Sequence, residues 1–156
     1  MKFLISIFIF FLPQLIFAQQ KTSAKFIILD ARLNNDVDMT PWVLENGGYL
    51  VFYENSQGNL LMGNIVPKKN TQSYGRLYSS NKESIDETEK LYKVDIFNFK
   101  WSYQNDYDVK KGTASIQLSK IFKPNGIAFT LKMILENLDI YIYKGYMEGT
   151  IDFSKY

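Results

Sequence analysis

The residues of this chain that could carry out chemistry are carboxylates, because the usual bases and nucleophiles are missing. The sequence contains no histidine and no cysteine, which excludes Ser-His-Asp and Cys-His catalysis and removes the commonest ligands of transition metals. Asp106 and Asp108 would lie about 6.6 Å apart in an extended chain, within the separation that inverting glycosidases use. A hydrolase that acts on carbohydrate through carboxylates alone is therefore the alternative hypothesis for this sequence.

The surroundings of these carboxylates favour a structural role. Asp106 and Asp108 belong to the stretch Asn-Asp-Tyr-Asp, which is typical of a turn, where Asp accepts hydrogen bonds from the backbone. Glu148 and Asp152 would share a strand face about 13 Å apart, too far for a catalytic pair. We therefore expect a protein that is not an enzyme.

Two further motifs are incomplete. Asp36-Val37-Asp38 looks like part of a calcium loop, as does the pair at 106 and 108, but neither continues into the Gly and the distant Glu of an EF-hand. Ser79-Ser80-Asn81-Lys82 matches one motif of penicillin-binding enzymes without the other two. We expect no cofactor and no metal site.

The charge balance argues against nucleic acid as a partner. Eighteen basic and 16 acidic residues give a formal net charge of +2, whereas phosphate binding needs a clustered positive face. Only Arg32 and Arg76 could make bidentate contacts to phosphate. Aromatic residues make up 16% of the chain, and such side chains suit sheet surfaces and the binding of apolar ligands or protein partners.

The first 18 residues have the pattern of a secretory signal peptide. Lys2 precedes an apolar run over 3–12, and Pro13 and a small residue, Ala18, follow it. A retained anchor is the alternative, but the run is shorter than the ~20 residues that cross a membrane as a helix. We expect a bacterial protein that is secreted or periplasmic, with residues 19–156 as a single domain that lacks disulfides.

The last third of the chain alternates apolar and polar residues over long stretches. One set is Ala114, Ile116 and Leu118, and a second set consists of Ile127, Phe129, Leu131, Met133 and Leu135. Period-two alternation predicts antiparallel strands with one buried face. A membrane-spanning barrel fits poorly, because the face that carries Tyr156 would also point Glu148 and Asp152 at lipid. We expect no membrane insertion of the mature chain.

The remaining segments complete the predicted strand pattern. Strands are expected over 25–33, 49–54, 60–66, 71–78 (a short edge strand), 91–103 and 140–153, with a solvated loop over 79–90. The apolar face of 91–103 switches near Ile96-Phe97, which predicts either a bulge there or a strand that passes from one packing environment to another. In 140–153, Gly145 and Gly149 predict bends, or a turn at Lys144-Gly145.

One helical turn is expected within 37–46. Thr40 would be its N-cap and Pro41 its first residue, a pairing that suits a helix start. Gly47-Gly48 would end it.

About eight sequential strands predict an antiparallel up-and-down barrel whose architecture resembles that of lipocalins. A two-sheet sandwich is the alternative. The resemblance is architectural only, because the Gly-x-Trp signature is missing: Thr40-Pro41 precedes Trp42.

A stripe of aromatic residues supplies the candidate binding site. Phe97, Phe99, Trp101 and Tyr103 share one face of the strand over 91–103, so they line either the core or a ligand cavity. We predict a secreted, non-catalytic domain that binds a small apolar ligand in the barrel mouth or a macromolecular partner.

Overall fold

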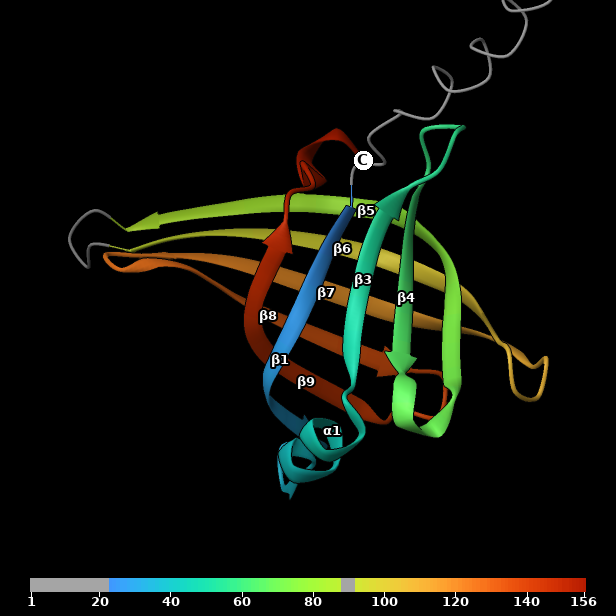
Figure 1. Cartoon of the computed structure of the whole chain (residues 1–156). Coiled ribbons are helices and arrows are strands. Elements are labelled where there is room, and N and C mark those ends of the chain that lie inside the picture. The colour runs from blue at the N-terminus through green and yellow to red at the C-terminus, as the bar shows by residue number, and fades with distance from the viewer. Residues whose placement is uncertain (1–22, 88–91) are drawn as a thin grey trace, which may run out of the picture.

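A single antiparallel sheet that closes on itself forms the protein (Figure 1). The computed structural model describes residues 23–87 and 92–156. Eight strands follow each other around the barrel in the order β1-β3-β4-β5-β6-β7-β8-β9, and β9 pairs with β1 to close it. The predicted up-and-down barrel is therefore confirmed, and the sandwich is not formed. The signal peptide predicted at residues 1–18 lies outside the described residues.

The elements come in the order of the chain and are joined mostly by tight turns. Their bounds are β1 Ser23–Leu33, β2 Val37–Asp38, α1 Thr40–Asn46, β3 Tyr49–Glu54, β4 Leu60–Val66, η1 Pro67–Lys69, β5 Thr71–Glu87, β6 Tyr92–Asn105, β7 Lys111–Lys123, β8 Gly126–Leu135, β9 Ile140–Gly149 and η3 Phe153–Lys155. The short β2 pairs only with the end of β1.

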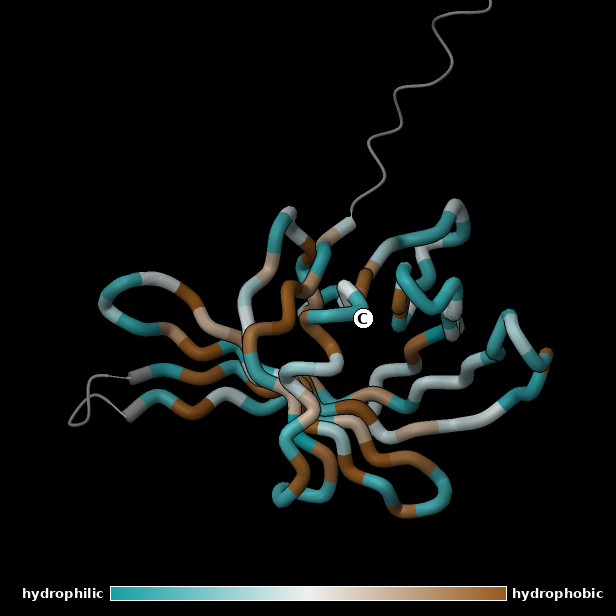
Figure 2. Tube along the Cα trace, turned by 60° about the horizontal axis from the view of Figure 1, so that its bottom comes forward, coloured by the Kyte–Doolittle hydropathy of each residue, from teal (hydrophilic) through white to brown (hydrophobic). Residues whose placement is uncertain are grey.

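The interior of the barrel holds the apolar residues of the alternating pattern. Figure 2 shows polar and apolar residues alternating along the strands, as expected when successive side chains point to opposite faces of a sheet. The fully buried side chains include Phe26, Leu50, Phe52, Leu60, Met62, Leu118 and Leu131, which come from five strands. Because every strand contributes to one core, the barrel is stabilised as a unit.

Closure of the barrel depends on Gly145. A Cβ atom at this position would lie 1.8 Å from the carbonyl oxygen of Ile27, so only glycine permits the approach of β9 to β1. The predicted bend falls here, because β9 pairs with β8 up to Gly145 and continues along β1 to Gly149. The alternative turn at Lys144-Gly145 is wrong, since β9 is continuous.

The prediction of a loop over 79–90 is wrong for the described residues 79–87. β5 runs to Glu87 and pairs with β6 from Ser73 to Glu87, although residues 79–87 have no alternating pattern. Backbone pairing with β6 satisfies the amide and carbonyl groups of β5, which outweighs its polar composition. Residues 88–90 of the expected loop lie outside the described residues.

The position of the free sheet edge also differs from the prediction. Residues 73–76 of β5 pair with both β4 and β6, so they do not form an edge. From Leu77 onward, β5 pairs with β6 alone. The far parts of β5 to β8 extend beyond the barrel, to the left in Figure 1.

The predicted position of the bulge needs correction. The bulge expected at Ile96-Phe97 lies instead in the neighbouring β5, where the β5–β6 register shifts between Ser79 and Asn81. Phe97 and the rest of β6 pair with β7 without interruption.

The helix α1 forms as predicted, but Thr40 is not its N-cap. Met39 occupies that position without a side-chain cap, and Pro41 lies in the first turn. The Thr40 hydroxyl oxygen instead accepts a hydrogen bond from the Ala31 amide at 2.9 Å, which ties the helix to β1. Gly47 ends α1 in the left-handed conformation.

The barrel has two ends, which we call the α1 end and the C-terminal end. At the C-terminal end, η3 places the Phe153 ring in the core, where 5% of the residue is exposed. This ring packs edge-on against Phe52 at 5.2 Å and lies 5.6 Å from Phe97 and 6.4 Å from Phe99. The Tyr156 hydroxyl donates a hydrogen bond to Glu54. The C-terminal segment thus fills this end of the barrel.

Candidate functional site

A cavity of about 440 Å³ opens at the α1 end, the lower end in Figure 1. It lies among the ends of β4, β6, β8 and the starts of β5 and β9, beside α1. Its lining is mostly aromatic and aliphatic, with a few amides and hydroxyls. The lining residues are Ile28, Met39, Trp42, Val43, Gly48, Asn64, Val66, Thr71, Gln72, Ser73, Trp101, Tyr103, Asn105, Tyr107, Met133, Leu135, Tyr141 and Tyr143.

Trp101 and Tyr103 form one wall of this cavity. They occupy alternate positions of β6, so both side chains point to the inside of the barrel. Their rings stack at 4.4 Å between centroids, with an angle of 28° between planes. Trp101 is 2% exposed, and its Nε1 has no hydrogen-bond partner among the described residues.

Two tyrosines of β9 form a second wall. The rings of Tyr141 and Tyr143 stack at 6.2 Å between centroids. Burial raises the pKa of both hydroxyls, most strongly that of Tyr143, and burial likewise raises the pKa of Tyr103. These phenols therefore stay protonated and neutral over the physiological pH range.

The helix α1 borders the cavity on the remaining side. Trp42 and Val43 are consecutive residues of α1; Val43 is buried against the core, whereas Trp42 is 42% exposed and lines the cavity. Asn46 donates a hydrogen bond from Nδ2 to the Trp42 carbonyl oxygen at 2.8 Å, which holds the helix together at this point. Both tryptophans of the chain, Trp42 and Trp101, thus line the same cavity.

The lining of the cavity carries no formal charge. Within residues 23–87 and 92–156, no Asp, Glu, Lys or Arg lines it. Its polar groups are neutral amides and hydroxyls, such as Ser73, whose hydroxyl bonds to the Asn105 side chain at 2.6 Å. The cavity can therefore hold an apolar molecule and direct a few polar groups of that molecule, but it offers no counter-ion.

Only two of the four aromatic residues predicted to line a ligand cavity do so. Trp101 and Tyr103 line the cavity. Phe97 and Phe99 face the same interior but lie towards the C-terminal end, packed against Phe153. Phe97 also borders a surface groove of about 960 Å³ beside η3.

Sequence reasoning missed the contributions of Trp42, Tyr141 and Tyr143 to the cavity. The alternating pattern put Tyr141 and Tyr143 on one face of the last strand, but it did not show that this face meets β6. Closure of the barrel brings the β9 tyrosines and Trp101 to the same cavity.

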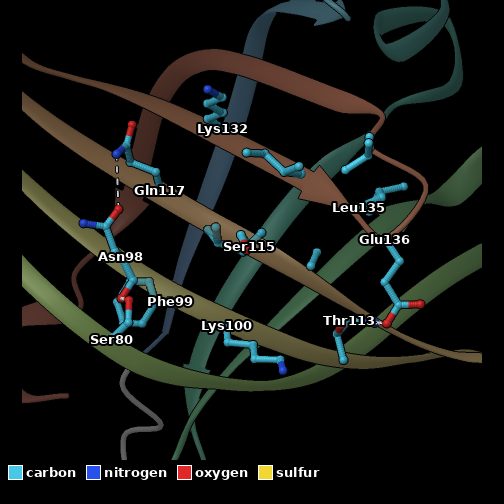
Figure 3. Close-up of a pocket in the computed structure, with 14 residues that line it drawn as sticks. Ser80, Asn98, Phe99, Lys100, Thr113, Ser115, Gln117, Lys132, Leu135 and Glu136 are labelled. Carbon is cyan, nitrogen blue, oxygen red and sulfur yellow. Dashed lines mark hydrogen bonds between the residues drawn. The ribbon is translucent and has the colours of Figure 1, made fainter.

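A second hollow of about 560 Å³ lies on the outer face of β6, β7 and β8 (Figure 3). Asn98 accepts a hydrogen bond from the Gln117 side chain at 3.2 Å, and the Thr113 hydroxyl donates one to Glu136 at 2.7 Å. These side chains satisfy each other across neighbouring strands, as polar pairs on a solvent-facing sheet do. The polar side chains of this hollow therefore have the arrangement of an ordinary solvent-facing sheet and do not indicate a binding site.

The candidate carboxylates have structural roles. Asp106 Oδ1 accepts from the Gln72 amide at 2.9 Å, and Asp108 Oδ1 accepts from the Lys110 amide at 3.1 Å. These are hydrogen bonds of the turn between β6 and β7 and of its contact with β5. In the part of the chain that the structure describes, no group of three or more Asp and Glu side chains is arranged to hold a metal ion.

The fold and site together define a closed antiparallel β-barrel with a filled C-terminal end and a neutral, aromatic cavity at its α1 end. Comparisons with protein-family models, with curated proteins and with solved structures found no match for this chain. Among residues 23–87 and 92–156, no helix is long and apolar enough to cross a membrane.

Proposed function

We propose that this protein binds a small, largely apolar molecule in the cavity at the α1 end of the barrel. The observation that carries the proposal is the cavity itself: about 440 Å³ of space at the α1 end, whereas at the opposite end the Phe153 ring packs into the core. Ligand sites of proteins have volumes of roughly 300–1,000 Å³ and are lined by hydrophobic and aromatic side chains with a few polar groups. The cavity has both properties.

The chemistry of the lining favours binding over hydrolysis. Acid–base catalysis by paired carboxylates requires two such groups at the substrate, and within the described ranges none lines this cavity. Asp106 and Asp108, the pair that suggested a hydrolase, are occupied by backbone hydrogen bonds. A non-catalytic role is therefore the better supported one.

Export is part of the proposal. The apolar run and Ala18 of the predicted leader support a secreted or periplasmic protein, where a barrel could capture or carry apolar molecules. The formal net charge of only +2 for the full sequence supports a partner other than nucleic acid.

The proposal is tested by native mass spectrometry of the purified protein, followed by titration with the neutral apolar dye N-phenylnaphthylamine. We expect a co-purified small molecule or saturable dye binding at one site per chain. A bare protein mass together with no dye binding would overturn the proposal.

A matched pair of variants locates the site. Thr71 lies at the start of β5 and lines the cavity, so Thr71→Trp is expected to fill it and reduce dye affinity at least about tenfold. Tyr74 is 45% exposed and does not line the cavity among the described residues, so Tyr74→Trp serves as the control with unchanged affinity. Equal affinities of the two variants would show that the dye binds elsewhere.

A further inference from the structure

Aromatic side chains are unusually frequent in the lining of the cavity at the α1 end. Six lining residues are aromatic, and they include both tryptophans of the chain: Trp42, Trp101, Tyr103, Tyr107, Tyr141 and Tyr143. The face of an aromatic ring is electrically negative and attracts cations, most strongly in tryptophan. Within residues 23–87 and 92–156, no Lys or Arg lines the cavity, so no side chain of the lining supplies a cation itself.

Several ring faces are available to a bound molecule. The stacked pairs of β6 and β9 have centroid separations of 4.4 and 6.2 Å, and each ring of a pair has one face that its partner does not cover. Trp42 and Tyr107 also line the cavity and are 42% and 60% exposed. Because these two side chains are so exposed, their rings have room to turn a face towards a molecule at the mouth of the cavity.

Carboxylates outside the lining make the electrostatic potential at the cavity negative. Burial comes first among the causes that raise the pKa of Tyr103, and the charges of Glu136 and Asp108 raise it further. Burial and then the charge of Asp139 raise the pKa of Tyr141. A negative charge raises the pKa of a phenol because it opposes the formation of the phenolate. It would oppose an anionic ligand in the same place and attract a cationic one.

Two of these carboxylates have neutral hydrogen-bond partners. Glu136 accepts a hydrogen bond from the Thr113 hydroxyl at 2.7 Å, and Asp139 accepts one from the Asn137 side chain at 2.7 Å. Neutral partners do not cancel the negative charge of a carboxylate. The field of Glu136 and Asp139 therefore reaches the neighbouring cavity.

The cost of burial restricts the kind of cation. A compact ammonium group is strongly hydrated and loses this hydration in a cavity that offers no counter-ion. A quaternary ammonium group spreads its charge over several carbon atoms, is weakly hydrated and binds well to aromatic faces. The aromatic lining therefore suits a cation of the second kind.

We infer that the ligand is an organic cation whose weakly hydrated head, such as a quaternary ammonium group, is attached to an apolar body. The head lies against the aromatic rings at the mouth, and the body fills the interior of the cavity. The inference rests on the proposed function, since it names the chemical class of ligand for the same cavity.

Three probes with one benzene ring test the inference: phenyltrimethylammonium, tert-butylbenzene and benzenesulfonate. The first two have the same shape, because a nitrogen atom replaces a carbon atom, and the third is an anion. A purely apolar cavity would bind tert-butylbenzene most tightly, because it is the least hydrated of the three. In isothermal titration calorimetry we expect the cation to bind at least as tightly as tert-butylbenzene. We expect benzenesulfonate to bind at least about tenfold more weakly than the cation.

A matched pair of charge reversals tests the part played by the carboxylates. Glu136 is exposed and directly follows β8, so Glu136→Lys is expected to weaken binding of the cation about fivefold and to leave tert-butylbenzene unchanged. Glu83 is also exposed and does not line the cavity among the described residues. Glu83→Lys is therefore the control, with unchanged affinity for both probes.

The part played by the rings is tested at Trp42, which is exposed enough to be replaced without loss of the core. Trp42→Leu keeps an apolar side chain and removes the ring. We expect it to weaken binding of phenyltrimethylammonium about threefold more than binding of tert-butylbenzene. Comparing the two probes cancels the loss of volume, which affects both alike.

The native protein supplies a further measurement, which does not depend on the folding of any variant. Added salt screens the attraction between exposed carboxylates and a cation. The affinity for phenyltrimethylammonium should therefore fall as the salt concentration rises, whereas the affinity for tert-butylbenzene should not fall.

The outcomes separate this inference from the proposed function. If neither the probes nor N-phenylnaphthylamine bind, the proposed function is wrong and the inference with it. If the dye binds but phenyltrimethylammonium binds more weakly than tert-butylbenzene or not at all, the cavity holds neutral molecules, and only the inference is overturned. Tightest binding of benzenesulfonate would also overturn it, as would equal losses of the cation and tert-butylbenzene in both Glu136→Lys and Trp42→Leu.

Discussion

The two ends of this barrel are built from the same aromatic stripe of β6 and differ in what covers it. At the C-terminal end, Phe97 and Phe99 meet the ring of Phe153, which the chain itself returns to the core. At the α1 end, Trp101 and Tyr103 face an unfilled cavity of about 440 Å³. Alternate residues of a single strand therefore serve as core at one end and as a candidate ligand wall at the other.

The difference shows that residue type and spacing do not distinguish core from binding site. Aromatic side chains on one face of a strand bury a large apolar area wherever a partner is supplied. At one end the partner is a three-residue turn of the same chain, Phe153–Lys155. At the other end we propose that it is a small molecule.

Removal of the Phe153 ring is the most severe test of the filled end. Phe153→Ala leaves a void between Phe52 and Phe97, and we expect a loss of about 3–5 kcal/mol in the free energy of unfolding. The measurement is urea-induced unfolding followed by circular dichroism. The control is Tyr107→Ala at the α1 end, where the residue is 60% exposed; a loss there as large as that of Phe153→Ala would contradict the comparison.

A matched pair of methionines compares the two environments directly. Met62 is fully buried in the core, whereas Met133 is 3% exposed and lines the cavity. Met→Ala costs about 2–5 kcal/mol of unfolding free energy in proteins. We expect a loss in the upper part of this range for Met62→Ala and in the lower part for Met133→Ala. The reason is that Met133 borders the cavity and therefore has fewer packing contacts to lose. Equal losses in urea unfolding would mean that the cavity closes in solution.

The hydrogen bond between Tyr156 and Glu54 is expected to contribute a smaller, pH-dependent stabilisation of the filled end. Tyr156→Phe removes this bond and is expected to cost about 1.5 kcal/mol near neutral pH. Burial, together with this bond and the charge of Glu54, raises the pKa of Tyr156 from 10.0 to about 12.

The raised pKa determines the direction of the pH effect. A group whose pKa is higher in the folded state stabilises the protein fully below its unfolded pKa, and the contribution disappears as pH rises through the folded value. The stability difference between native protein and Tyr156→Phe should therefore shrink between pH 10.0 and about 12. Unfolding curves across this interval test it; a constant difference would show that the hydroxyl is not responsible.

The smallest effect on stability is expected at the border of the open end. Trp42 is 42% exposed, so Trp42→Ala should change the free energy of unfolding by only about 0.5 kcal/mol. The same variant removes part of the cavity wall and should weaken dye binding severalfold. If stability fell by several kcal/mol, α1 would belong to the core and not to a binding site.

Much of the fold was accessible from the pattern of residues. Alternation along 114–118 and 127–135 predicted strands, and these residues belong to β7 and β8. Most of the expected side chains are buried, but Ile127 is 45% exposed and Leu135 is only partly buried. Pro41 and Gly47 marked the limits of α1, because a proline suits the first turn of a helix and a glycine suits its end. The glycine at 145 pointed to the bend of the last strand.

Other features could not be predicted because they arise from pairing between distant segments. The polar half of β5 is a strand only because β6 lies beside it, and its sequence carries no trace of that pairing. Of the candidate site, Trp101 and Tyr103 were found from their spacing, whereas Tyr141, Tyr143 and Trp42 were not. These residues come from distant parts of the chain and meet only in the closed barrel.

The sequence by itself therefore determined the inward-facing side of the strands that alternate, such as β7 and β8, since apolar side chains leave water at every second residue. Only the tertiary structure decided which inward-facing residues are covered by the chain and which are left open. Which inward-facing residues are covered depends on where β9 and the C-terminal turn pack after the sheet closes. Such long-range packing cannot be read from local periodicity.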